Sequence, residues 1–185
     1  MHRNLAFITL ILCVFSSAAQ AEFYGTLKAS YFTGVDDFDD EQSFGLVFGK
    51  QFNDIHAVEL EAQINGFDST DPGFEVDADV FTYLLNYNYT FWNEGNWRAK
   101  LGAGIGFADA EFGISADERG DDNPFVWQVG AEADYHVSDN FSATFGLRVQ
   151  DFGEASDGGV TYEVGTPVVV SVGLRYNFWP MQVCL

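Results

Sequence analysis

Apolar and polar residues alternate over stretches of about ten residues in this chain, and the stretch from Phe81 to Phe91 shows the pattern most clearly. Its odd positions are aromatic or leucine, and every even position except Leu84 is polar. Strict alternation predicts a β-strand with one apolar face. A strand tilted by about 45° needs roughly 9–11 residues to cross the hydrocarbon of a bilayer. The pattern therefore predicts a strand that crosses a membrane.

The same periodicity predicts eight strands along the chain. They cover residues 23–32, 43–52, 56–67, 80–91, 97–108, 124–137, 141–151 and 167–178. The connections at 52–55, 92–96 and 137–140 are short, whereas those at 33–42, 68–79, 108–123 and 151–166 are long and rich in Gly and Asp. We therefore predict an all-β fold, an eight-stranded antiparallel up-and-down transmembrane β-barrel with short periplasmic turns and four long acidic extracellular loops.

The size of the side chains decides which face of the strands points outward. A soluble, lipocalin-like barrel also alternates, but it puts its apolar face inside. The interior of an eight-stranded barrel is only just wide enough for side chains to fill, and the apolar face here carries too many large rings for it. We expect this face to contact lipid, with Lys50 snorkelling to the rim. We also expect two aromatic belts, the outer one comprising Phe32, Phe44, Phe67, Phe81, Phe107, Phe125 and Phe152.

The polar face of the strands carries charges of both signs. They are Lys28, Glu59, Glu61, Arg98, Lys100, Glu132, Asp134, Arg148 and Arg175. Buried charges must be paired and hydrogen-bonded, so we predict a salt-bridged plug in the lumen. Strands 97–108 and 124–137 are antiparallel neighbours, which predicts that Arg98 or Lys100 pairs with Glu132 or Asp134.

The ends of the chain differ from the strands. Residues 1–21 have a basic start, an apolar run and a small-x-small end at Ala19-Gln20-Ala21, which predicts a secretory signal peptide. The barrel then covers residues 22–178, and residues 179–185 form a short tail. Cys184 is the only cysteine after the predicted signal, which excludes an intramolecular disulfide.

With its signal, eight strands, charged lumen and final Arg175-Tyr176-Asn177-Phe178, the chain resembles the small eight-stranded outer-membrane barrels of the OmpA and OmpX type. The resemblance implies a monomer in the lipid of the bacterial outer membrane. It also implies a role for the barrel-assembly machinery, which reads the last aromatic residue of such barrels during insertion.

The long connections hold most of the 28 acids, with Arg119 as their one base. Ca²⁺ and Mg²⁺ take oxygen ligands, so the candidate metal ligands are Asp36, Asp37, Asp39, Asp40, Glu41, Asp117, Asp121 and Asp122. Neither the run of acids at 36–41 nor the run at 117–122 has the spacing of an EF-hand loop. We favour a solvated, repulsive rim without a cofactor, and the same charge argues against nucleic acid.

An enzyme on this scaffold needs a nucleophile and its base within hydrogen-bond reach. His136-Val137-Ser138 resembles the His and Ser spacing of lipid A deacylases, but the predicted turn puts it at the periplasmic rim, in the wrong leaflet. We expect His56 and Ser138 to be turn residues and His136 to belong to the lumen network. The expected function is a non-enzymatic structural or surface-interaction role through the acidic loops, with an extracellular partner that the sequence does not name. The alternatives are a small-solute channel and a lipid-modifying enzyme.

Overall fold

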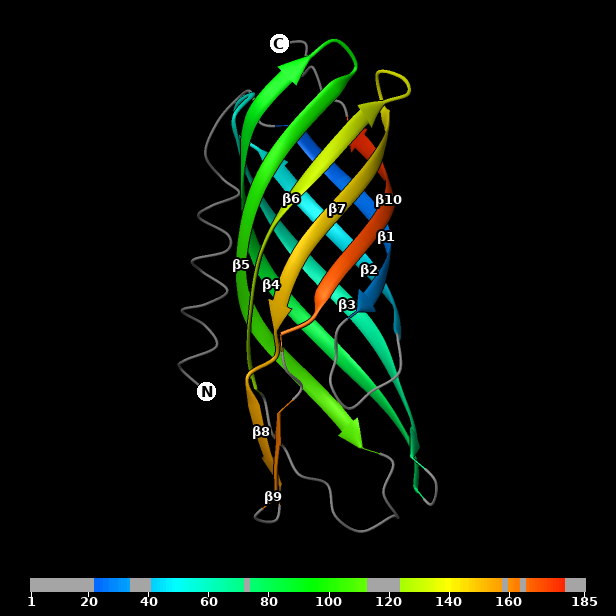
Figure 1. Cartoon of the computed structure of the whole chain (residues 1–185). Helices are drawn as coiled ribbons and strands as arrows, with labels where there is room; N and C mark the ends of the chain where they lie inside the picture. Colours follow the sequence, from blue (N-terminus) through cyan, green and yellow to red (C-terminus); the bar gives the residue numbers. More distant parts are fainter. Residues whose placement is uncertain are drawn as a thin grey trace.

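The computed structural model describes residues 22–33, 41–71, 74–112, 124–157, 160–163 and 166–178. Eight strands close into a barrel in the order β1-β10-β7-β6-β5-β4-β3-β2, and all neighbours are antiparallel (Figure 1). The barrel strands are β1 (Glu22–Thr33), β2 (Glu41–Gln51), β3 (His56–Asp71), β4 (Phe74–Glu94), β5 (Trp97–Phe112), β6 (Phe125–His136), β7 (Phe141–Asp151) and β10 (Val168–Phe178). The predicted eight-stranded barrel is confirmed.

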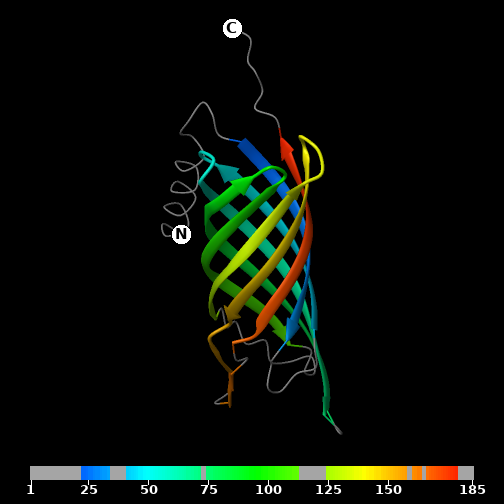
Figure 2. The same cartoon turned by 45° about the horizontal axis from the view of Figure 1, so that its top comes forward.

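The two rims of the barrel differ in their connections. Residues 52–55, 95–96 and 137–140 join strands at one rim, here called the short-turn rim, where β1 begins and β10 ends (Figure 2). Asn53 shapes the first of these turns, because its side-chain oxygen accepts hydrogen bonds from the N–H groups of Ile55 and His56. Gly95 has a φ of 59°, a left-handed conformation that favours glycine. The opposite rim is called the long-loop rim.

Three strands run further toward the long-loop rim than the sequence predicts. The β3–β4 ladder continues until Asp71 pairs with Phe74, so the predicted loop at 68–79 is wrong. Strand β5 continues to Phe112. The predicted loop at 151–166 contains a hairpin of β8 (Glu154–Asp157) and β9 (Val160–Glu163). Acids interrupt the apolar period in these segments, and that period was the signal for a strand.

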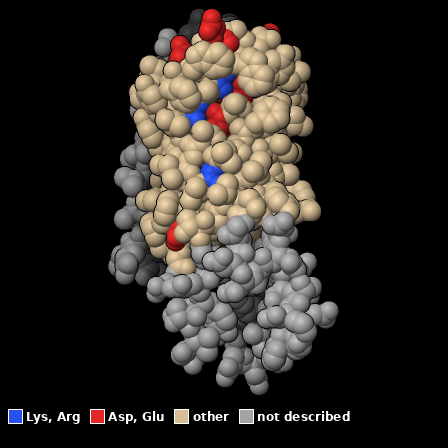
Figure 3. Space-filling model, in the orientation of Figure 1, with Lys and Arg blue, Asp and Glu red and all other residues tan. Residues whose placement is uncertain are grey.

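The apolar side chains face outward, as predicted. Leu27, Phe44, Leu46, Ile105 and Leu174 are all more than half exposed on the barrel wall. In Figure 3 the wall is almost continuous uncharged surface, with only small blue and red areas over the strands. The described residues contain no helix with the length and hydropathy that a membrane span requires.

Aromatic residues gather at the short-turn rim. A bulge between Thr90 and Trp92 leaves both Phe91 and Trp92 exposed on the wall. Ring pairs join neighbouring strands there, with centroid distances of 4.9 Å for Trp97–Tyr135 and 5.0 Å for Phe141–Tyr176.

Lys50 departs from the prediction. Its side chain is enclosed, with 1% of its surface exposed, and its ammonium lies 5.4 Å and 5.2 Å from the ring centres of Phe23 and Phe52. The ammonium is therefore covered by aromatic rings instead of reaching out to water, because a ring face attracts a cation.

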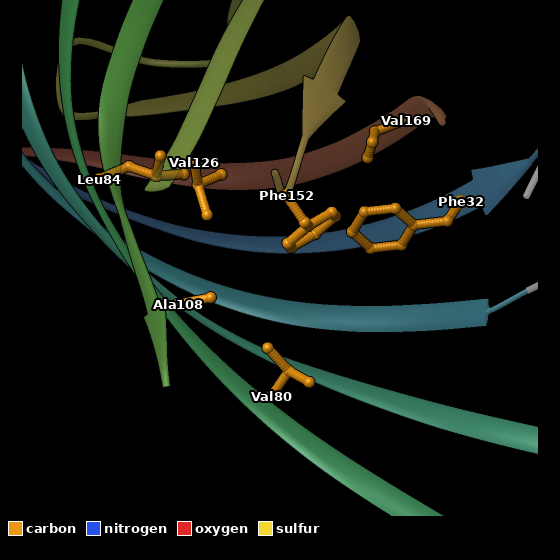
Figure 4. Packing of buried hydrophobic residues seen from close by; sticks show 7 residues of the cluster. All are labelled: Phe32, Val80, Leu84, Ala108, Val126, Phe152 and Val169. Carbon is orange, nitrogen blue, oxygen red and sulfur yellow. The ribbon is translucent and has the colours of Figure 1, made fainter. Parts of the chain in front are cut away.

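The interior near the long-loop rim is apolar, which the sequence prediction missed. Seven buried side chains form a cluster that we call the apolar cap (Figure 4): Phe32, Val80, Leu84, Ala108, Val126, Phe152 and Val169. Phe32 and Phe152 were predicted in the outer aromatic belt, and this is wrong, because both rings lie inside the barrel with their centroids 6.0 Å apart.

Candidate functional site: the charged lumen

Charged side chains fill the lumen between the apolar cap and the short-turn rim. Those that make ion pairs are here called the ion network: Lys28, Glu59, Glu61, Lys100, Glu132, Asp134, Arg148 and Arg175. They project inward because each occupies the polar parity of its strand. The network balances positive against negative groups, as buried charges require.

Glu132 on β6 is a centre of this network. One of its oxygens lies 2.6 Å from the ammonium of Lys100 and 2.7 Å from the guanidinium of Arg175. Its other oxygen lies 2.9 Å from Lys28. The carboxylate therefore joins β6 to β5, β10 and β1. Asp134 lies two residues further along β6, on the same face. It contacts Lys100 at 3.1 Å and also pairs with Arg175.

Glu61 on β3 is a second centre, nearer the middle of the barrel. Arg148 on β7 donates to it at 2.9 Å, across the full width of the lumen. Asn86 and Gln63 each donate to the same carboxylate at 2.8 Å. Gln128 donates to Asn86 at 2.7 Å, which extends the chain of hydrogen bonds to β6.

Tyr24 connects the network to the wall. Its hydroxyl donates to Glu59 at 2.7 Å, and the guanidinium of Arg175 lies 4.4 Å from its ring centre. The ring occupies the space above Gly49, where a Cβ would overlap it. Glycine at this position therefore makes room for the tyrosine.

Other inward-facing glycines lie beside the long charged side chains Arg148 and Lys28. Gly130 pairs with Arg148 across the β6–β7 ladder, and a Cβ on this glycine would lie 2.5 Å from the Arg148 Cβ. Lys28 faces Gly45 on one side and Gly173 on the other. Glycines at these positions thus help the charges of Lys28 and Arg148 to fit inside a narrow barrel.

A small cavity remains inside the network. Its volume is about 40 Å³, and Lys28, Glu61, Gln128, Glu132 and Arg148 are among the residues that line it. This space fits one or a few water molecules.

The structure brings together eight of the nine sequence-predicted lumen charges. The predicted pairing between β5 and β6 is made by Lys100, whereas Arg98 donates to Gln51 at 2.7 Å near the short-turn rim. The sequence reasoning missed the neutral partners Tyr24, Gln63, Asn86 and Gln128. Their inward parity is a signal in the sequence, but charge as a criterion selects only the ionised residues of that face.

The two histidines among the described residues, His56 and His136, lie in different parts of the barrel. His136 contacts the Ser142 hydroxyl at 2.9 Å, while Ser138 accepts a hydrogen bond from the N–H of Phe141 in the turn. His56 opens β3, where its ring nitrogen lies 2.6 Å from the Tyr87 hydroxyl on the outer wall.

Most of the predicted metal candidates lie outside the described residues. They are Asp36, Asp37, Asp39, Asp40, Asp117, Asp121 and Asp122. Glu41 opens β2, but its side chain is also outside the described part. The side chains that the structure does describe contain no group of three or more His, Cys, Asp or Glu residues able to hold a metal ion.

Comparison with known proteins agrees with this architecture. The family described as outer membrane protein beta-barrel domain matches residues 5–178. No curated protein matches the chain.

Three solved structures are similar in fold. Neisserial surface protein A has a TM-score of 0.67 and 16% identity, over 85% of this chain and 99% of its own. Outer membrane protein OprG from Pseudomonas aeruginosa has a TM-score of 0.62 and 14% identity, over 85% and 95%. Outer membrane protein W from E. coli has a TM-score of 0.55 and 16% identity, over 85% and 98%.

Proposed function

We propose a non-enzymatic structural or surface-interaction role for this chain, which belongs to the outer membrane protein beta-barrel domain family and lies in the bacterial outer membrane. We place the short turns in the periplasm and the long-loop rim outside the cell. Outer-membrane lipid surrounds the apolar wall, the barrel-assembly machinery inserts it, and the barrel acts as a monomer.

The observation that carries this proposal is the filled lumen. The ion network joins opposite walls, as in the Arg148–Glu61 pair. The apolar cap fills the lumen between this network and the long-loop rim. The cavity that lies within the ion network has a volume of only about 40 Å³. Ion conduction requires a continuous aqueous path, so a channel is the weaker alternative.

The histidine geometry supports the absence of catalysis. His136 is bonded to Ser142, whose side chain is fully buried and closed to a lipid substrate. Ser138 is held in its turn by the Phe141 N–H instead of by a general base. A nucleophile needs its base within hydrogen-bond reach and access to substrate.

The surface role is supported by the strands that extend past the barrel. Asn65 is the last β3 residue paired with β2, and beyond it β3 continues to Asp71. This extension is about 20 Å long at about 3.4 Å per residue. This part of the β3–β4 ladder, to which β5 also pairs at Ala78 and Asp79, carries the acids of 68–79 away from the membrane surface.

The channel alternative is tested by conductance. The purified barrel, refolded into a planar bilayer, is expected to give no current steps. Its current trace is expected to match that of a protein-free membrane. Regular steps from the unaltered chain would contradict the non-conducting role and establish the channel. A general porin under the same conditions verifies that insertion is detectable.

The surface role and the absence of enzyme activity need separate measurements. A protease that cuts after acidic residues is expected to cleave the chain on intact cells, and full protection would contradict surface exposure of the long-loop rim.

Incubation with lipid A is expected to release no acyl chain. Release that Ser138→Ala abolishes would establish the lipid-modifying enzyme.

A further inference from the structure

We propose that Phe152 is a gate at the long-loop end of the lumen, which opens to admit water and small solutes to a buried polar layer. This inference goes beyond the surface role, because it assigns a moving part to the barrel interior.

The first observation is the origin of the side chains in the apolar cap. Six of the seven members belong to barrel strands, whereas Phe152 follows the end of β7 at Asp151 (Figure 4). A residue within a barrel strand cannot leave the lumen without breaking the ladder. Phe152 lies outside the β6–β7 ladder, whose last pair is Trp127–Asp151, so displacing its ring breaks no pair of that ladder but loses the contact with Phe32, at 6.0 Å between ring centroids.

The second observation is a polar latch that fixes the segment carrying Phe152. One carboxylate oxygen of Asp151 accepts a hydrogen bond from the Gly153 N–H, and the other accepts one from the Thr166 hydroxyl, both at 2.8 Å. The Asp151–Thr166 contact is exposed, so water competes for it. Gly153 has a φ of 65°, a left-handed conformation that favours glycine.

The third observation is the layer beneath the cap. Ser43, Asn65 and Gln150 are almost completely buried there. Within the described residues, both amide atoms of Gln150, the Asn65 Oδ1 and the Ser43 hydroxyl have no hydrogen-bond partner. Asn65 donates to the Val80 carbonyl, which places this layer directly against the cap.

These observations together favour an opening equilibrium. Buried polar atoms without partners are unfavourable, and hydration relieves that penalty. Opening at Phe152 therefore exposes apolar surface but hydrates the polar layer, so the two effects offset each other. Apolar constrictions of this kind block water and ions while they are closed. The Arg148–Glu61 pair lies deeper and remains a separate barrier when the gate opens.

The test measures access to a thiol placed in the polar layer. The background carries Cys13→Ser and Cys184→Ser, with Gln150→Cys as one reporter. Thr82→Cys is a second, independent reporter, because Thr82 is fully buried and its hydroxyl accepts a hydrogen bond from the Asn65 side chain at 3.0 Å. The barrel is refolded in vesicles and treated with a charged, membrane-impermeant thiol reagent. Phe152→Ala is expected to raise the labelling rate of both reporters by about tenfold or more, a factor that corresponds to about 1.4 kcal/mol in the opening equilibrium.

The latch variant separates a gate from a fixed plug. Asp151→Asn keeps the Phe152 ring but weakens the latch, and it is expected to raise the labelling rate by about threefold to tenfold. Phe145→Ala, on the outer wall of the same strand, is the matched control and is expected to leave the rate unchanged. Gel mobility before and after boiling verifies that each variant is folded.

Two results would overturn the gate. Equal labelling rates with and without the Phe152 ring would show that it does not close the lumen. A rise with Phe152→Ala but none with Asp151→Asn would make the ring a fixed plug. Bilayer current from the unaltered chain would instead contradict the proposed function, so the two failures are distinguishable.

Discussion

Single carboxylates hold several strands together in this interior. Glu132 on β6 contacts one base from each of three other strands: Lys28, Lys100 and Arg175. Pairing between neighbouring strands does not explain the Lys28–Glu132 contact, because β1 and β6 are not neighbours and stand on different sides of the lumen. The loss of one carboxylate thus affects several walls at once.

We expect Glu132→Ala to destabilise the barrel by about 3–5 kcal/mol, the usual cost of leaving buried charges uncompensated. The measurement is the urea unfolding midpoint of the detergent-refolded protein. Asp54→Ala is the control, since Asp54 is an exposed acid in a short turn and its removal is expected to change little. Equal midpoints for the two variants would mean that the network does not stabilise the fold.

The adjacent leucines on β4 give a second comparison. Leu84 is 3% exposed in the apolar cap, whereas Leu85 is 39% exposed on the wall. We expect Leu84→Ala to cost about 2–5 kcal/mol, because it leaves a cavity in a packed cluster. Leu85→Ala is expected to cost less, since lipid fills the space. Midpoints that rank the other way would contradict the assigned faces.

The faces of individual residues were predictable from sequence only where alternation was the deciding evidence. The lumen charges are one such case, because their parity alone placed them inside. Phe32 shares the parity of Lys28 and Ser30, which already placed it inside, but its aromatic character suggested the belt. Phe152 lies outside a strand, where no parity exists, so the apolar cap was not predictable from the pattern.

At the scale of strands, the register explains which contacts the sequence predicts. Neighbouring antiparallel strands follow from chain order, which was sufficient for Lys100 and Glu132. The pairing of Arg148 with Glu61 depends on barrel diameter and on side-chain reach across the lumen. Those quantities are set by closure of the whole barrel, and local sequence does not contain them.

The tight β6–β7 contact predicts a sharp difference between two glycines. A Cβ at Gly130 would lie 2.5 Å from the Arg148 Cβ, whereas a Cβ at Gly66 would meet nothing within 4 Å. We expect Gly130→Ala to destabilise the barrel by about 1–3 kcal/mol through overpacking. Gly66→Ala is expected to be neutral or slightly stabilising. Urea midpoints measure both, and a neutral Gly130→Ala would contradict the close approach.

At the scale of the whole molecule, the barrel inverts the arrangement of a soluble protein. Its wall is apolar, and its interior outside the apolar cap is mostly polar. The hydrocarbon core of a bilayer holds no water to hydrogen-bond an open strand edge, so closure of the β1–β10 ladder is required for a membrane barrel. The charged interior and apolar wall therefore depend on the same closed ring of strands.

Leu85 tests this arrangement directly, because it lies at mid-strand between Leu60 and Ile105 on the wall. We expect Leu85→Arg to cost about 2–4 kcal/mol, the penalty for arginine near the bilayer midplane, and Val137→Arg at the short-turn rim to cost only about 0–1 kcal/mol. The measurement is the fraction folded in lipid vesicles, scored by gel mobility before and after boiling. If Leu85→Arg gave a folded protein that stayed soluble without detergent or lipid, the wall would not face a bilayer. Equal folded fractions for the two arginine variants would also contradict the depth that the register assigns to Leu85.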